Sequence, residues 1–257
     1  MAGFYRSILI LLSGFLALSS GCSSISPGNL SDVQPVTEIF YPRVGNVYLF
    51  RGFIGVFSTG MNELNERLQV EGVRSHIYQA DQWSSVADEI AKQYKSRSDA
   101  EPIILAGHSY GADNVLRIAQ KLKEQGVKID LIITLDPVTP PQVPPNVNKV
   151  INLYQSNGPM DKLPWLRGIP LEAERPGSVV VINQDIRKDR TDLLEPGLNH
   201  FNIEKQTKIR NEVIQQIKQV CLPRPIWAMR KSLPTLDGQS IENSQAPTTY
   251  PSQAKLN

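Results

Sequence analysis

The sequence predicts an α/β fold in which a mostly parallel sheet of about six strands carries helices on both faces. Short apolar runs alternate with amphipathic segments between residues 47 and 220, and this alternation is typical of parallel strands joined by helices. One junction carries a serine between two glycines, in Gly107-His108-Ser109-Tyr110-Gly111, directly after an apolar run. Parallel sheets keep their chemistry at the carboxyl ends of the strands, so we expect the functional residues there.

Each element is expected where the apolar residues have the matching period. Strands are expected in short runs rich in apolar and β-branched residues, and helices where apolar residues recur every three to four positions. In the first helix, Met61, Leu64 and Leu68 recur on one face. The expected strands are 47–50, 73–78, 103–106, 129–135, 150–154 and 179–183, and the expected helices are 60–69, 84–94, 112–125 and 202–220.

The segment around Ser109 meets the requirements of a nucleophile elbow. The chain must reverse within a couple of residues between a strand and a helix, which strains the serine backbone and leaves no room for a Cβ on its neighbours. Gly107 and Gly111 satisfy that requirement. The bare pattern also arises by chance, so the strand before it and the helix after it carry the prediction. Ser109 is therefore the predicted nucleophile.

A serine hydroxyl is a weak nucleophile near neutral pH and needs a base beside it. Of the three histidines, His108 lies within the elbow and His76 in an expected strand. His200 lies in the loop before the last expected helix, from which an imidazole can reach back over the sheet. His200 is the predicted base by elimination. The alternative for His200 is a residue at the start of a helix that makes local hydrogen bonds.

The predicted acid is Asp136, which directly follows the expected strand 129–135. Its carboxylate would accept the Nδ1 hydrogen of His200 and stabilise the imidazolium formed during attack. Alternatively, Asp136 caps the proline-rich turn that begins at Pro137. Other aspartates preserve the chain order of serine, acid and histidine: Asp161, Asp185, Asp189 and Asp192.

Residues 47–220 resemble the α/β-hydrolases, and an acid directly after the strand that follows the elbow helix is similar to that of lipase-like members. The resemblance implies a Ser109, Asp136 and His200 triad and acyl transfer without a cofactor. It does not define the substrate, because proteins with this fold include esterases, lipases, thioesterases, amidases and acyltransferases.

The resemblance also implies an oxyanion hole built from backbone N–H groups. One is that of Tyr110, after the nucleophile, and the other belongs to Phe53 or to Ile54. Many family members place His-Gly in this loop, whereas here Arg51 precedes Gly52. Arg51 makes the local field more positive toward an anionic substrate, or it forms a surface ion pair or braces the loop.

The N-terminus has the pattern of an export signal. Arg6 precedes the apolar run 8–18, which is too short for the roughly 20 apolar residues of a spanning helix. Small residues before Cys22 resemble a bacterial lipobox, which implies a signal peptide over residues 1–21 and a diacylated Cys22.

The fit to the lipobox is incomplete. The usual leucine three residues before the cysteine is replaced by Ser19, with Leu18 one position earlier. Ser23 resembles an outer-membrane sorting signal. We expect a lipid-anchored protein of the bacterial cell envelope, held at the outer membrane and facing the periplasm. The alternative is secretion after cleavage by an ordinary signal peptidase.

The rest of the chain divides into three parts. Residues 22–38, rich in Ser, Pro, Gly and Asn, are an expected lipidated tether, and residues 39–221 form the expected hydrolase domain. Residues 222–257 lack an apolar period and are expected to be disordered or draped on the surface. The segment 155–178 carries several apolar residues between two expected strands. It is either a mobile flap over the site or ordinary packing under a long loop.

Composition excludes several classes of function. The formal net charge is +2 and no Lys/Arg cluster with interleaved aromatics occurs, so nucleic-acid binding has no support. Phosphate-binding glycine loops are missing, and the histidines lack metal-ligand spacing. The two cysteines, Cys22 and Cys221, make no disulfide scaffold, although they could pair if Cys22 carries no lipid. We expect a monomer without metal or cofactor.

Together these observations predict a serine hydrolase that cleaves a carboxylic ester or thioester through an acyl-enzyme. An acyltransferase would share the mechanism up to deacylation. The alternative from another class is a catalytically silent lipoprotein that uses the same fold as a binding module.

Overall fold

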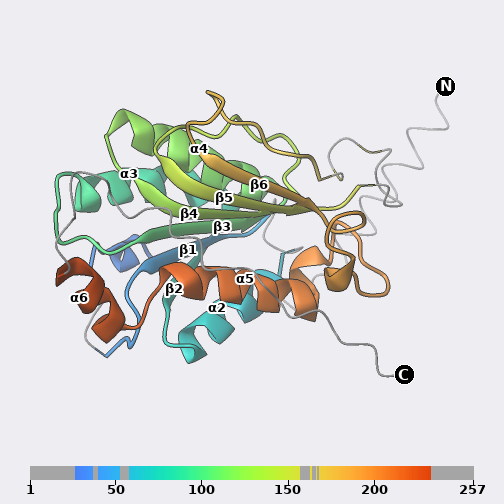
Figure 1. The fold of residues 1–257 in the computed structure, drawn as a ribbon. Coiled ribbons are helices and arrows are strands. Elements are labelled where there is room, and N and C mark those ends of the chain that lie inside the picture. Colours follow the sequence, from blue (N-terminus) through green and yellow to red (C-terminus); the bar gives the residue numbers. More distant parts are fainter. Residues whose placement is uncertain are drawn as a thin grey trace, which may run out of the picture.

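The computed structural model describes residues 27–36, 40–52, 58–156 and 168–232, together with Leu163 and Leu166. Within these ranges six strands form one sheet, in which all neighbours run parallel (Figure 1). The strands are β1 (Asn46–Phe50), β2 (Arg74–Tyr78), β3 (Ile103–His108), β4 (Ile129–Leu135), β5 (Val147–Tyr154) and β6 (Val180–Asp185), and their order across the sheet is β2-β1-β3-β4-β5-β6. The predicted fold class is confirmed.

Helices cover both faces of the sheet (Figure 1). One face carries α3 (Trp83–Tyr94) and α4 (Tyr110–Glu124), and the other carries α2 (Gly60–Val70) and α5 (Thr207–Val220). Side chains alternate across a strand, so Tyr48 of β1 packs toward α3 and α4 while Leu49 packs toward α2 and α5. Each face therefore has its own apolar core.

The parallel arrangement brings the predicted site to one edge of the sheet. His108, the last residue of β3, pairs with Leu135 at the end of β4, which in turn pairs with Leu153 of β5. Ser109 and Asp136 follow β3 and β4 directly, and His200 lies in the loop after β6. β3 is two residues longer than expected because Gly107 and His108 still pair with neighbouring strands.

The two ends of the described chain differ from the expectation. A tether was expected up to residue 38, yet Val33 is 1 % exposed and belongs to the core on the α3 and α4 face. Residues 222–257 are expected to be disordered or draped on the surface, and in the described part of this range α6 (Arg224–Ser232) forms a helix without buried residues. The 3-10 turns are η1 (Leu30–Asp32), η2 (Ala80–Gln82), η3 (Thr191–Leu193) and η4 (Ile203–Lys205). None of the helices in the described ranges has the length and apolar character that crossing a membrane requires.

Candidate active site

Ser109 has the strained backbone that a nucleophile elbow requires. Its φ is 56° and its ψ is −125°, in a region that non-glycine residues rarely adopt. A Cβ on Gly107 would lie 2.3 Å from the Gly111 carbonyl oxygen, and a Cβ on Gly111 would lie 2.4 Å from the carbonyl oxygen of Arg51. Both glycines are therefore required by close backbone approach, as the sequence predicted.

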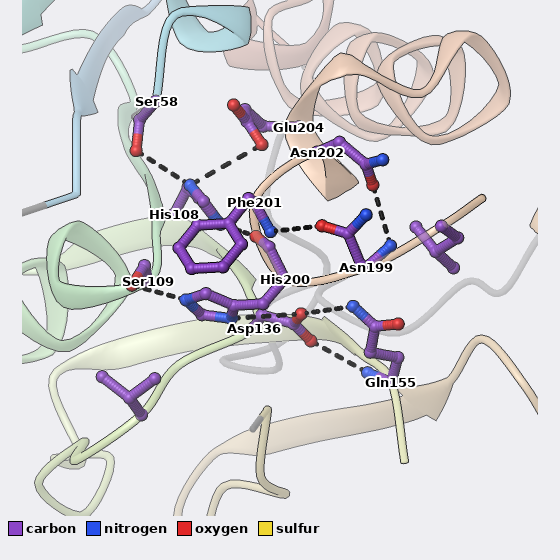
Figure 2. A network of polar contacts seen from close by, with 12 residues as sticks. Ser58, His108, Ser109, Asp136, Gln155, Asn199, His200, Phe201, Asn202 and Glu204 are labelled. Atoms are coloured by element: carbon purple, nitrogen blue, oxygen red, sulfur yellow. Dashed lines mark hydrogen bonds and ion pairs between the residues drawn. The ribbon is translucent and has the colours of Figure 1, made fainter. Parts of the chain in front are cut away.

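The structure brings Ser109, His200 and Asp136 together (Figure 2). Ser109 Oγ lies 2.9 Å from His200 Nε2, and His200 Nδ1 lies 3.4 Å from Asp136 Oδ2. The side chains of His200 and Asp136 are 3 % and 0 % exposed, so water hardly screens their interaction. The geometry is that of a nucleophile, a base and an orienting acid.

Asp136 is held in place by a residue that the sequence analysis did not single out. Gln155, directly after β5, donates its backbone N–H to Asp136 Oδ1 at 2.9 Å and its side-chain amide to Oδ2 at 2.8 Å (Figure 2). Arg187 donates to Gln155 Oε1 at 2.9 Å and to the Leu198 carbonyl at 2.7 Å. This pair fixes the carboxylate relative to the loop that carries His200.

The other aspartates have partners elsewhere. Asp185 accepts from the hydroxyl of Ser156 and pairs with Lys188 at 3.2 Å. Asp189 accepts the Asp185 N–H at 2.9 Å, and Asp192 pairs with Arg190 at 2.9 Å. Asp161 lies outside the described residues.

Local hydrogen bonds shape the loop that presents His200. Asn202 Oδ1 accepts the Asn199 N–H at 2.8 Å, and Asn199 Oδ1 accepts the Phe201 N–H at 2.9 Å (Figure 2). Gly197 has a φ of 77°, which glycine adopts without strain. The Gly-Leu-Asn-His-Phe-Asn segment therefore folds into turns made by its own asparagine side chains.

His108 connects three parts of the site. Its Nε2 lies 2.8 Å from the His200 carbonyl oxygen and its Nδ1 lies 2.9 Å from Ser58 Oγ (Figure 2). Ser58 Oγ also accepts the Gly52 N–H at 2.8 Å. A carbonyl only accepts, so Nε2 carries the hydrogen and Nδ1 accepts from the Ser58 hydroxyl. Burial lowers the pKa of His108 to about 3, with a further contribution from His200. His108 is therefore neutral and braces the loop after β1 against the loop of His200.

A buried acid lies behind His108. Glu204 Oε2 is 3.7 Å from His108 Nδ1, and the Glu204 side chain is 0 % exposed. Neither of its carboxyl oxygens has a hydrogen-bond partner among the residues that the structure describes. Burial raises the pKa of Glu204 to about 7. Neither this acid nor the bracing role of His108 is predictable from the sequence, because both depend on contacts between distant segments.

A cavity of about 430 Å³ opens above the serine. Its apolar lining comes mainly from Val138, Leu166 and Phe201. The loop after β4 is held by Asp113 of α4, which accepts the N–H groups of Val138 at 3.0 Å and Thr139 at 2.9 Å. The volume is in the range of small-molecule sites.

Only part of the predicted oxyanion hole lies within the described residues. Tyr110 begins α4 directly after Ser109, so its backbone N–H belongs to the first turn of that helix. A Cβ on Gly52 would lie 3.3 Å from the Ser109 Cβ, which places the loop after β1 beside the nucleophile. Phe53 and Ile54 lie outside the described ranges. Arg51 is 4 % exposed and bonds Asn62 of α2 through Nε at 2.9 Å, so it braces the loop.

The predicted lipidation residue, Cys22, also lies outside the described residues. Cys221 is a buried free thiol. Within the part of the chain that is described, no group of three or more His, Cys, Asp or Glu side chains could hold a metal ion.

Comparison with solved structures finds distant likenesses. An α/β-superfamily hydrolase from Xanthomonas campestris pv. campestris is 12% identical, with 67% of this chain and 99% of that chain covered and a TM-score of 0.38. The thioesterase domain that cyclises the lipopeptide antibiotic surfactin is 12% identical, with coverages of 73% and 97% and a TM-score of 0.41. A cutinase-like protein from Cryptococcus sp. is 13% identical, with coverages of 72% and 97% and a TM-score of 0.40.

Residues 50–173 match the model of the thioesterase domain, a range that includes Ser109 and Asp136. No curated protein matches the chain. The match supports a hydrolase that acts on an ester or thioester. Together with the parallel sheet order and the strained serine between β3 and α4, the match supports the resemblance of the chain to the α/β-hydrolase superfamily.

Proposed function

We propose that the protein is a serine hydrolase that cleaves a carboxylic ester or thioester through an acyl-enzyme intermediate. One observation carries the proposal: Ser109, in a strained elbow, lies 2.9 Å from His200 Nε2, and His200 Nδ1 faces the buried Asp136. The match of residues 50–173 to the thioesterase domain supports the cleavage of a thioester or a related ester bond.

In the proposed mechanism, His200 Nε2 takes the Ser109 proton as Oγ attacks the substrate carbonyl carbon. The tetrahedral oxyanion accepts hydrogen bonds from the backbone N–H groups of Tyr110 and Phe53. As the intermediate collapses, the imidazolium gives its proton to the leaving alkoxide or thiolate, and the acyl group stays on Oγ. Water then attacks the acyl-enzyme with His200 as base, which releases the acid and restores Ser109.

Asp136 orients His200 and stabilises its charged form. His200 Nδ1 and Asp136 Oδ2 are 3.4 Å apart, and catalytic hydrogen bonds of this kind tighten as charge develops in the transition state. Gln155 donates to both carboxylate oxygens of Asp136, and Oδ2 is also the oxygen that faces His200 Nδ1.

We also propose that Cys22 is diacylated and that the protein is held at the outer membrane, facing the periplasm. The apolar run, the small residues before Cys22 and Ser23 after it support this location. Two lipid chains would give a durable anchor.

The mechanism is tested with an activity-based probe. A fluorophosphonate should label the wild-type protein and should not label Ser109→Ala. An unlabelled protein that is folded by circular dichroism would favour the silent binding module and overturn the proposal.

The acid is tested in the same assay. Asp136→Asn should lower kcat by up to about four orders of magnitude, because the histidine takes the wrong tautomer. Asp192→Asn is the matched control, since Asp192 is exposed and pairs with Arg190, and it should retain activity. Asparagine would turn an N–H toward a Gln155 donor, so the Tm of Asp136→Asn is measured beside its activity. Equal losses of activity in Asp136→Asn and Asp192→Asn would mean that Asp136 is not the acid of the triad.

A further inference from the structure

We infer that the substrate is a long-chain acyl ester carried by the membrane to which the protein is anchored. The inference rests on the proposed function and on the proposed lipidation of Cys22. It follows from where the N-terminal segment joins the folded domain, how short the link to Cys22 is, and what lines the cavity above Ser109.

The N-terminal segment is fixed to the domain from Gly28 onward. Gly28 donates its N–H to Gln82 Oε1 at 2.9 Å, and Gln82 Nε2 donates to the Gly28 carbonyl at 2.8 Å. A Cβ on Gly28 would lie 2.3 Å from the Ile77 carbonyl oxygen and 2.5 Å from the Tyr78 ring, so this contact admits only glycine. The Tyr78 hydroxyl donates to the Asn29 carbonyl at 3.3 Å. These contacts hold the segment at one defined place.

That place is the catalytic edge of the sheet. Tyr78 is the last residue of β2 and pairs with Phe50, which pairs with Gly107, two residues before Ser109. Neighbouring strands lie about 4.8 Å apart, so Tyr78 is roughly 10 Å along the edge from Gly107. η2, which contains Gln82, also contacts the beginning of α4, where Asn114 donates to the Ala80 carbonyl at 2.8 Å. The segment therefore joins the domain on the side where the cavity opens.

The link to the proposed anchor is short. Five residue steps separate Cys22 from Pro27, the first described residue. A fully extended chain covers at most about 3.6 Å per residue, so the link spans no more than roughly 18 Å. A lipid on Cys22 would keep Pro27, at the β2 end of the catalytic edge, within that reach of the bilayer surface.

The cavity suits an apolar, uncharged substrate. Among the described residues that line it, none is Lys, Arg, Asp or Glu. Val138, Leu166 and Phe201 supply apolar surface, and Phe201 is 37% exposed beside His200. An acyl chain that leaves the bilayer would bury its apolar surface against these side chains, at about 25 cal/mol per Å².

The test compares two substrates on the same lipidated, full-length protein. The protein is reconstituted in vesicles of phosphatidylethanolamine and phosphatidylglycerol that contain a fluorogenic long-chain glycerolipid ester, and a water-soluble butyrate ester is assayed in parallel. A Gly-Ser insertion of about 20 residues between Ser26 and Pro27 lengthens the link about fivefold. The vesicle rate should fall roughly tenfold, because effective concentration falls as the −3/2 power of length, while the butyrate rate stays unchanged.

A single substitution tests the fixed contact itself. Gln82→Ala removes both hydrogen bonds to Gly28 and frees several residues of the N-terminal segment, which lengthens the link to Cys22. The vesicle rate should therefore fall about two- to threefold, by the same dependence of effective concentration on link length. Gln219→Ala, on the exposed face of α5, is the matched control and should change neither rate.

The outcomes separate the two proposals. If the insertion leaves the ratio of vesicle rate to butyrate rate unchanged, the inference is wrong. It is equally wrong if a clickable palmitate analogue labels wild type and Cys22→Ser alike. If the wild type cleaves neither ester and takes no fluorophosphonate, the proposed function itself fails.

Discussion

Glu204 is a buried acid that the proposed chemistry does not use. Its pKa is raised to about 7 from the ordinary 4.5 because burial disfavours the carboxylate. The folded protein therefore holds this proton up to about pH 7, whereas the unfolded chain releases it near pH 4.5. The resulting stabilisation is fully present below pH 4.5 and is lost as the pH rises through 7.

Glu204→Gln should remove this dependence of stability on pH. Relative to wild type, its free energy of unfolding should be similar near pH 4.5 and higher by on the order of 2 to 3 kcal/mol at pH 8. Urea unfolding at several pH values measures the difference. His108, whose pKa is lowered to about 3, makes a contribution to stability that is lost as the pH falls below 6.5. This contribution is common to the wild type and Glu204→Gln. Glu66→Gln, on the exposed face of α2, should show no such trend. A difference independent of pH would mean that Glu204 is ionised throughout.

Single residues were predictable where their chemistry depends on type and chain position. Ser109, Asp136 and His200 each lie at the end of a strand or in a loop at one edge of the sheet, and the structure brings them together. Gln155 and His108 were not predictable in their observed roles. Their hydrogen bonds reach residues 19 and 92 positions away, and no local pattern encodes such contacts.

At the scale of elements, the described residues between β5 and β6 have two different environments. Gly168 packs against Asp136, where a Cβ would lie 2.2 Å from Oδ1, and Leu171 is 4 % exposed in the core. Leu166 instead lines the cavity above Ser109. The part near residue 168 thus supports the acid, and Leu166 faces the substrate space.

Leu166→Ala should therefore change chain-length selectivity while leaving the chemistry intact. Removing part of the apolar lining should cost about 1 to 2 kcal/mol of binding to a long acyl chain, which lowers kcat/KM roughly 5- to 30-fold. A series of nitrophenyl esters measures this effect, and the butyrate ester should be cleaved at the wild-type rate. Leu163→Ala is the matched control, because Leu163 is 37% exposed and does not line the cavity. Equal losses on short and long esters would show that Leu166 supports the catalytic loops.

The order and type of the elements followed from apolar periodicity, and their ends were less predictable. All six strands and four of the helices were expected near their observed positions. The last expected helix began at residue 202, whereas the chain there forms η4 before α5 starts at Thr207. α6 was not predicted because none of its side chains is buried, so it needs no apolar face, and the side chain of Arg224 provides its hydrogen bonds to Tyr41 and Glu101.

At the scale of the whole molecule, the C-terminal segment meets residues 41–45, which lead into β1, at the edge of the sheet opposite Ser109. Arg224 of α6 donates to Glu101 Oε1 at 3.0 Å and to the Tyr41 carbonyl at 2.7 Å. Glu101, which is 6 % exposed, accepts the Gly45 N–H at 2.8 Å just before β1. Arg43 donates to the Cys221 carbonyl at 2.9 Å. The C-terminal segment therefore closes the domain over the first strand.

Arg224→Ala should separate stability from catalysis. The substitution removes a partly buried cation from Glu101 and should lower the free energy of unfolding by about 1 to 3 kcal/mol, measured by urea denaturation. β3 is six residues long and separates Glu101 from Ser109 by roughly 20 Å, so kcat on a soluble ester should be unchanged below the unfolding transition. Arg230→Ala is the matched control, because Arg230 is exposed on the same helix and should change stability by less than about 0.5 kcal/mol. If Arg224→Ala left the unfolding curve where it was, α6 would contribute nothing to the fold, and the expectation of a tail merely draped on the surface would be the better description.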